Sequence, residues 1–136
     1  MKNFTSPTQK IGELGEDIAC RWLGKKGFTI IDRNYTKKWG EIDIVAERRG
    51  VTHFVEVKSS RLRQGFGGQA KNDYNPAENM HEWKIKRLAR AIQTYLMTSK
   101  GQKINQSVGG WQVDLLIVYL DLDKKFARCE VFEKIM

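Results

Sequence analysis

Apolar residues repeat at helical spacing near the start of the chain. The repeat follows three- and four-residue steps through Ile11, Leu14, Ile18 and Trp22, with Ala19 and Leu23 on one flank. Such a stripe is typical of a helix that packs one side against a core. Ser6 fits the N-cap of this helix, Pro7 its first position and Gly27 the residue that ends it.

Three shorter segments, residues 28–31, 41–47 and 52–59, are rich in β-branched residues. The second and third also alternate in polarity, and alternation with a period of two predicts β-strands. Because only residues 48–51 separate these two segments, we expect them to form a hairpin.

Beyond residue 59 the pattern changes again. Residues 60–79 are polar and have no helical period, so we expect a long loop, which is usually functional or disordered. The helical period returns at about Pro76, and its apolar face consists of His81, Ile85, Leu88, Ile92 and Leu96. We expect Gly101 to end this helix, and residues 111–120 and 126–132 to form a buried strand and an edge strand. Together these elements predict one α/β domain over residues 1–136.

The register of the hairpin follows from its residues if the turn lies at Arg49–Gly50. One face is then nearly uniformly apolar, with the pairs Ile42–Val57, Ile44–Val55 and Ala46–His53. A shift of one residue would set apolar side chains opposite charged ones, which a buried face resists. On the other face this register pairs Asp43 with Glu56, and Glu41 with Lys58.

Two carboxylates that face each other on neighbouring strands repel one another. A hard divalent cation such as Mg²⁺ or Mn²⁺ removes this repulsion, because it takes oxygen ligands. We therefore interpret Asp43 and Glu56 as a candidate metal site. Lys58 projects from the same face, where it would orient an attacking water and stabilise negative charge at phosphorus. Ordinary charged pairs on the open face of a hairpin explain the pattern equally well.

The first helix offers a further carboxylate. At about 100° per residue, Glu16 lies at the edge of the apolar stripe, beside Ala19 and Leu23, whereas Glu13 points further toward solvent. Glu16 is therefore the better candidate for a site near the sheet.

The charge of the chain adds information about its partners. There are 24 Lys and Arg residues against 16 Asp and Glu, which gives a net charge of +8 and a pI near 9.6. This excess suits a polyanion such as nucleic acid, because each neutralised phosphate releases counterions. The chain has no apolar run near the roughly 20 residues that span a bilayer, and no segment that reads as a signal peptide. Cys20 and Cys129 form no C-x-x-C pair. We therefore expect a cytoplasmic protein with no membrane or zinc site.

A series of short motifs occurs in one order along the chain. They are Gly12-Glu13-Leu14-Gly15-Glu16, Arg33-Asn34-Tyr35, Gly40-Glu41-Ile42-Asp43, Phe54-Val55-Glu56-Val57-Lys58, Phe66-Gly67, Lys84 with Arg87-Leu88, Tyr95-Leu96, and Asp114. From about residue 10 to 120, this series closely resembles the YraN-like family of uncharacterised bacterial proteins. That family is similar in turn to archaeal Holliday-junction resolvases and other members of the PD-(D/E)XK nuclease superfamily.

The resemblance implies a restriction-endonuclease-like core, in which helices flank a central mixed β-sheet. It also implies dependence on Mg²⁺ or Mn²⁺ and a DNA substrate, with branched DNA as one candidate. Resolvases act as dimers, so a homodimer is one option for this chain, and its oligomeric state stays open. Asp43 and Glu56 match the metal-binding acids of the superfamily and Lys58 its motif lysine. Glu16 matches the acidic residue of the first helix, so the implied catalytic set has four members.

Basic residues further along are candidates for DNA contacts. Lys84 matches a recurring basic residue at the start of the second long helix, where it suits a phosphate contact. Arg61 and Arg63 in the expected loop, and Arg87 on that helix, are further candidates. A solvated loop and the wet face of a helix explain these arginines equally well.

Three functions stay open at this point. The first is a metal-dependent DNA endonuclease, which hydrolyses phosphodiester bonds in branched or structured DNA such as Holliday junctions. The second is a nucleic-acid-binding adaptor that has the nuclease fold but little or no hydrolytic activity. The third is a protein-interaction subunit whose basic charge is incidental. Asp43, Glu56 and Lys58 favour the first, because a pure binding module needs no opposed acids beside a phosphate.

Overall fold

The computed structural model describes residues 7–61 and 82–136. Its elements are α1 (Pro7–Lys25), β1 (Thr29–Lys37), β2 (Gly40–Arg48), β3 (Val51–Arg61), α3 (Glu82–Leu96), α4 (Ser99–Asn105), β4 (Trp111–Asp121) and β5 (Phe126–Phe132). The strands form a five-stranded sheet in the order β1-β2-β3-β4-β5. β3 and β4 are parallel, and the other neighbours are antiparallel. The predicted α/β fold, a mixed sheet flanked by helices, is confirmed, and it is compatible with a restriction-endonuclease-like core.

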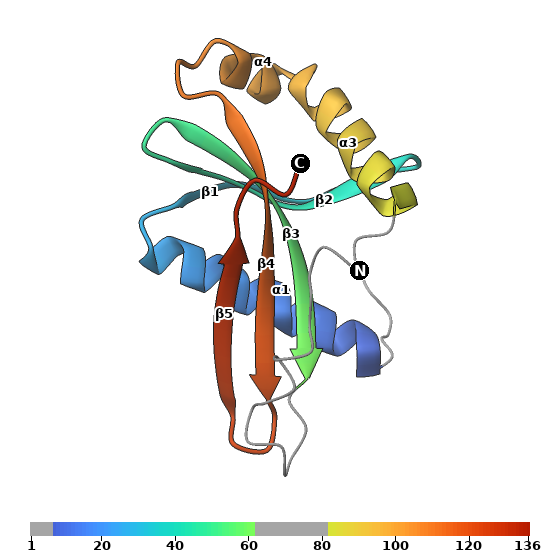
Figure 1. Ribbon diagram of the computed structural model, residues 1–136, viewed down its shortest axis with the longest axis vertical. Helices are drawn as coiled ribbons and strands as arrows, with labels where there is room; N and C mark the ends of the chain where they lie inside the picture. Colours follow the sequence, from blue (N-terminus) through green and yellow to red (C-terminus); the bar gives the residue numbers. More distant parts are fainter. Residues whose placement is uncertain (1–6, 62–81) are drawn as a thin grey trace.

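Helices cover both faces of the sheet, with α1 on one side and α3 and α4 on the other (Figure 1). The buried residues under α1 are Ala19, Leu23, Ile44, Ala46, Val55, Leu116, Val118 and Leu120. The buried residues under α3 and α4 are Ile42, Val45, Phe54, Leu88, Ala91, Ile92, Tyr95, Ile104 and Val113. The middle of the β2–β3 hairpin is therefore buried from both sides. Within the described ranges, no helix has the length and apolar character needed to cross a bilayer.

The buried stripe of α1 lies beside the one that the sequence pattern predicts. Its centre runs through Gly15, Ala19 and Leu23, whereas Leu14 is 39% exposed. A Cβ on Gly15 would overlap the Ser59 side chain of β3, so the small residues face the sheet and let the helix backbone approach it. A count of large apolar residues misses this, because the closest approach needs the smallest side chains.

Two other boundaries differ from the sequence prediction. β1 continues to Lys37 and turns at residues 38–39 into β2, although only residues 28–31 have a clear strand pattern. β1 is an edge strand with many exposed positions, and the polar residues at these positions weaken the pattern that predicts a strand. The second long helix ends at Leu96 and not at Gly101, because Thr98 caps the separate helix α4 by accepting a hydrogen bond from the Gly101 N–H.

Gly40 sets the distance between β2 and α3. A Cβ at this position would overlap the backbone carbonyl of Arg87, which cannot move without shifting the helix. We therefore expect Gly40→Ala to lower the free energy of unfolding by about 1–3 kcal/mol, measured by urea denaturation. Gly24→Ala is the control, because a Cβ there meets open space within α1 and should stabilise the protein by about 0.5–1 kcal/mol. Equal effects from the two substitutions would contradict this account of Gly40.

Candidate metal and catalytic site

The β2–β3 hairpin has the predicted turn and register over most of its length. Arg49 and Gly50 form the turn with φ values of 54° and 78°, as a tight two-residue hairpin turn requires. Ile44 pairs with Val55 and Ala46 with His53, as predicted. The ladder, all of whose residues are described, stops at the Ile44–Val55 pair. The predicted ladder pairs Asp43–Glu56, Ile42–Val57 and Glu41–Lys58 are therefore wrong.

The alternation of faces along β2 breaks at Asp43. Ile42 and Val45 both lie in the cluster under α3, although strict alternation would put Ile42 on the face of Ile44. Across the β1–β2 ladder, Asn34 lies between two regular pairs and has a φ of 54°. An irregular residue on the neighbouring strand thus accompanies the change in direction of β2.

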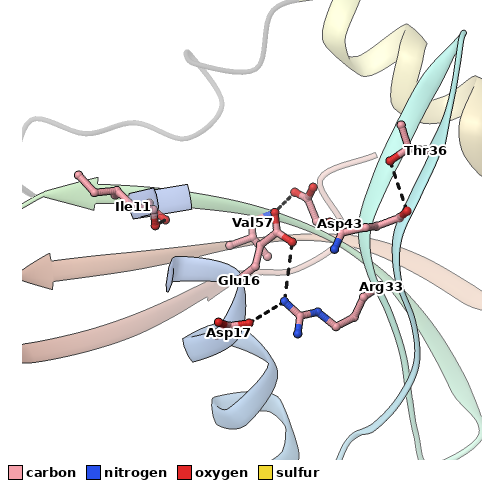
Figure 2. Close-up of polar contacts among 9 residues, drawn as sticks. Ile11, Glu16, Asp17, Arg33, Thr36, Asp43 and Val57 are labelled. Atoms are coloured by element: carbon pink, nitrogen blue, oxygen red, sulfur yellow. Dashed lines mark hydrogen bonds and ion pairs between the residues drawn. The ribbon is translucent and has the colours of Figure 1, made fainter. Parts of the chain in front are cut away.

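Asp43 contacts β3 through its side chain. Its Oδ2 accepts a hydrogen bond of 2.8 Å from the backbone N–H of Val57 (Figure 2). This bond holds the carboxylate beside the segment that carries Glu56 and Lys58. The two acids therefore come together by a different route from the ladder pairing that the sequence suggests.

The two carboxylates lie in an electrostatically unfavourable environment, in which Glu56 is buried and Asp43 is partly buried. Burial, together with the charge of Glu56, raises the pKa of Asp43 from 3.8 to about 8. The Val57 N–H opposes this shift, while Glu16 and Glu41 add to it. Glu56 is 7% exposed, and burial also raises its pKa, against the opposing effect of Lys84. Four acidic groups thus influence one another around Asp43, and their repulsion is only partly compensated.

This environment excludes one of the readings that the sequence left open. Ordinary surface pairs would lie on an open, hydrated face of the hairpin. Here Glu56 is only 7% exposed, and Phe54, two residues before it on the same face of β3, is 0% exposed under α3. The acids thus lie at the edge of a packed core, where charge is costly unless a partner compensates it.

Glu16 approaches this site from α1, as Figure 2 shows. Its charge contributes to the raised pKa of Asp43. Arg33 of β1 lies 4.0 Å from Glu16 and donates a hydrogen bond of 2.9 Å to Asp17. The sequence pattern gives Arg33 and Asp17 no role in the site, because the predicted strand ends at residue 31, before Arg33.

Two lysines act on Glu56 from different elements. Lys84 of α3 forms an ion pair of 3.1 Å with the Oε1 atom of Glu56. Lys58 follows two residues after Glu56 on β3, so both project from the same face, and its charge lowers the pKa of Glu56. The structure thus brings Asp43, Glu56, Lys58 and Glu16 into one region, and it adds Lys84 to them.

Of the remaining basic candidates, Arg61 lies on β3 and Arg87 on α3. Arg61 is the exposed last residue of β3, in a strand that pairs with β4, although the sequence pattern predicts a loop from residue 60. Arg87 is exposed on α3, and its Nη1 donates to the carbonyl of Lys38 at 3.5 Å. Arg63 and the rest of the predicted loop up to residue 79 lie outside the described residues.

The residues at the site fit a hard divalent cation. Their donors are carboxylate oxygens, the ligands that Mg²⁺ and Mn²⁺ prefer. Asp43 is bonded to the Val57 N–H, next to the buried Glu56, and the charge of Glu56 raises the free energy of the ionised form of Asp43. A bound cation would reverse that effect, since it favours both ionised carboxylates.

A second group of ligand-type side chains lies at the other end of β3. His53, Asp114 and Glu133 have ligand atoms within 4.8 Å of one another, the one such group of three among the described residues. Asp114 already accepts hydrogen bonds from His53 Nδ1 at 2.6 Å, from Gln112 at 2.8 Å and from the backbone N–H of Lys134 at 3.1 Å. These bonds satisfy the carboxylate without a metal, so Asp114 anchors the chain after β5 to the sheet.

Asp114 should therefore matter for stability. Burial alone would raise its pKa, but the hydrogen bonds from His53 and Gln112 lower it below 3.8. We expect Asp114→Ala to lower the free energy of unfolding by about 2–4 kcal/mol at pH 7. Since the folded pKa is depressed, this difference is present above the unfolded pKa and shrinks as the pH falls through the folded value. Urea denaturation over a pH series measures it. An unchanged stability at pH 7 would refute this role, and affinity for Mn²⁺ should stay unchanged.

Comparison with known proteins gives a consistent assignment. The model of the uncharacterised protein family UPF0102 matches residues 15–118. A UPF0102 protein of Helicobacter hepaticus is 37% identical over 124 residues, which cover 91% of this chain and 92% of the relative. A UPF0102 protein of Campylobacter lari is 36% identical over 110 residues, covering 81% and 84%. One from Sulfurovum sp. is 36% identical over 108 residues, covering 79% and 81%. These names state no activity.

Proposed function

We propose that this chain, which belongs to the uncharacterised protein family UPF0102, is a metal-dependent DNA endonuclease that acts on branched or structured DNA such as Holliday junctions. The observation that carries this proposal is the pair of acids Asp43 and Glu56. Glu56 is buried and Asp43 is partly buried, and the charge of Glu56 raises the pKa of Asp43, while Lys58 shares the face of β3 that carries Glu56. A binding module gains nothing from holding such a pair, whereas phosphodiester hydrolysis uses both the acids and the lysine.

In this mechanism Asp43 and Glu56 would hold Mg²⁺ or Mn²⁺, which would supply a Lewis acid for the phosphate and lower the pKa of a water molecule. Lys58 orients that water and stabilises the negative charge that develops on the phosphate oxygens. Glu16, on α1 beside Arg33, adds negative charge next to Asp43, where it would accept a hydrogen bond from the attacking water.

The charge of the protein supports a DNA substrate. The excess of eight positive charges favours a polyanion. Arg61 and Arg87 are exposed on β3 and α3, the two elements that carry Glu56 and Lys84. We propose that they contact phosphates on either side of the cleaved bond. We also propose that the protein acts in the cytoplasm. A homodimer would allow two strands of a junction to be cut symmetrically, and sedimentation or size-exclusion chromatography tests for it.

A cleavage assay tests the proposed function. Four-way-junction, single-stranded and duplex DNA are each incubated with the protein and Mg²⁺ or Mn²⁺. We expect the wild type to cut at least one substrate, and Glu56→Gln, purified in the same way, to cut none. The matched variant excludes a contaminating nuclease. Absence of cleavage on every substrate, with salt-sensitive DNA binding retained, would reject the nuclease in favour of the adaptor.

A further inference from the structure

The ammonium group of Lys84 binds Glu56, one of the two proposed metal ligands. Its Nζ atom lies 3.1 Å from the Oε1 atom of Glu56. The Glu56 side chain is only 10% exposed, whereas that of Lys84 is 38% exposed. The ammonium group thus reaches from a partly hydrated position on α3 to neutralise a buried acid.

An ammonium group and a divalent cation compete for the same carboxylate. A metal ion bound to Glu56 lies about 2.1 Å from the oxygen that it shares with Lys84. With the ion pair intact, Nζ and the ion would lie within about 5 Å of each other, in a poorly hydrated place where like charges repel strongly. This repulsion weakens the contact of Lys84 with Glu56 when a metal ion binds, and so favours release of the ammonium group.

The surroundings of Lys84 provide a place for the displaced ammonium group. Lys84 stands in the first turn of α3, and Arg87 lies one turn further along the same helix. Arg87 is exposed and contacts the tip of the β1–β2 hairpin through the carbonyl of Lys38. Arg90 is exposed one further turn along. A released Lys84 thus joins a row of basic residues that suits a chain of phosphates.

We propose that Lys84 is an exchange residue: it neutralises Glu56 while no metal is bound, and it transfers to a DNA phosphate when a divalent cation takes its place. This inference rests on the proposed function and specifies how metal and DNA bind to the same site. It requires that the two ligands bind with positive cooperativity. A bound metal ion releases Lys84 for a phosphate, and a phosphate that holds Lys84 leaves Glu56 open to the metal ion. The coupling must be reciprocal, since it is a free energy shared by both binding steps.

The first experiment uses the metal alone. Mn²⁺ is titrated calorimetrically into the wild type, into Lys84→Met, which keeps an apolar stem of similar length, and into Lys86→Met. The last variant removes one charge from the same helix and serves as the control. We expect Lys84→Met to bind Mn²⁺ about three- to tenfold more tightly than the wild type, and Lys86→Met to bind it about equally. Unchanged or weaker Mn²⁺ binding by Lys84→Met would overturn the exchange.

The second experiment measures DNA binding without turnover. A short fluorescein-labelled duplex is titrated with protein, with and without Ca²⁺, which takes the same oxygen ligands as Mg²⁺. We expect Ca²⁺ to increase the DNA affinity of the wild type, and this increase to be smaller in Lys84→Met, which keeps only the direct contact between the cation and the phosphate. An equal increase in both proteins would reject the exchange.

Failure of the exchange can be distinguished from failure of the proposed function. If the wild type binds Mn²⁺ through Asp43 and Glu56 and cleaves DNA, but Lys84→Met does not bind Mn²⁺ more tightly, the exchange alone is wrong. If the wild type shows no Mn²⁺ binding that depends on these acids, both the exchange and the nuclease are wrong.

Discussion

Replacing Asp43 by asparagine is expected to abolish DNA cleavage and, at the same time, to stabilise the metal-free protein. Asparagine lacks the charge that holds a divalent cation, so cleavage should fall by at least about 10³-fold, to background. Its side-chain oxygen still accepts the hydrogen bond from the Val57 N–H, so the local structure is kept. The free energy of unfolding without metal should rise by about 1–3 kcal/mol, and the melting temperature by about 3–10 °C.

The sign of this effect follows from the pKa of Asp43. The folded protein raises that pKa from 3.8 to about 8. Between these values the unfolded chain releases a proton that the folded chain keeps, so the stability of the wild type falls as the pH rises. Asparagine has no such proton. The advantage of Asp43→Asn should therefore grow from about pH 4 to about pH 8 and stay constant above that.

Thermal denaturation in the presence of a chelator, at several pH values, measures this advantage. Asp17→Asn is the matched control, because Asp17 is an exposed acid that pairs with Arg33. It should change the stability by less than about 1 kcal/mol, without a gain. A lower melting temperature for Asp43→Asn, or a gain that does not change with pH, would contradict the proposed repulsion in the site.

Replacing Lys58 by methionine is expected to lower the rate of cleavage by about 10²–10⁴-fold while the metal still binds. Lys58 and Glu56 project from the same face of β3, so the amine lies next to the bound phosphate in the proposed mechanism. Its loss removes a positive charge from the transition state. The oxygen ligands of the metal, Asp43 and Glu56, are unchanged, so Mn²⁺ affinity should vary by only a few-fold.

Single-turnover cleavage at saturating metal, together with a Mn²⁺ titration, separates these two effects for Lys58→Met. Circular dichroism verifies that the variant is folded. A variant that cleaves at the wild-type rate would remove Lys58 from the mechanism. A variant that loses metal binding as well as cleavage would make Lys58 a residue that maintains the site rather than one that acts on the phosphate.

The sequence predicts the hairpin well where local rules apply. The turn at Arg49–Gly50 and the pairs up to Ile44–Val55 follow from alternation and turn chemistry, which depend on neighbouring residues alone. The prediction fails at Asp43. The pattern predicts a ladder pair with Glu56, whereas in the structure the Asp43 side chain accepts a hydrogen bond from the Val57 N–H. The break accompanies the conformation of Asn34 on another strand, so no pattern within β2 and β3 reveals it.

The sequence pattern also does not predict the contacts around the acids. Lys84 has the residue type of a phosphate contact, and its ion pair with Glu56 depends on the way that α3 packs over the sheet. Arg33 reaches Asp17 and Glu16 because β1 lies beside α1, and polar edge strands carry a weak signal. The order of the motifs predicts the site residues, whereas tertiary packing determines which residues contact them.

A calorimetric titration of Mn²⁺ at pH 7 tests most directly whether Asp43 and Glu56 bind a divalent cation. Performed in two buffers of different ionisation enthalpy, the titration also counts protons. Asp43 has a pKa of about 8, so the wild type should bind Mn²⁺ and release about one proton. Asp43→Asn and Glu56→Gln should show no binding at this site. If the wild type does not bind Mn²⁺, or if both variants bind it as tightly as the wild type, Asp43 and Glu56 do not form the proposed metal site.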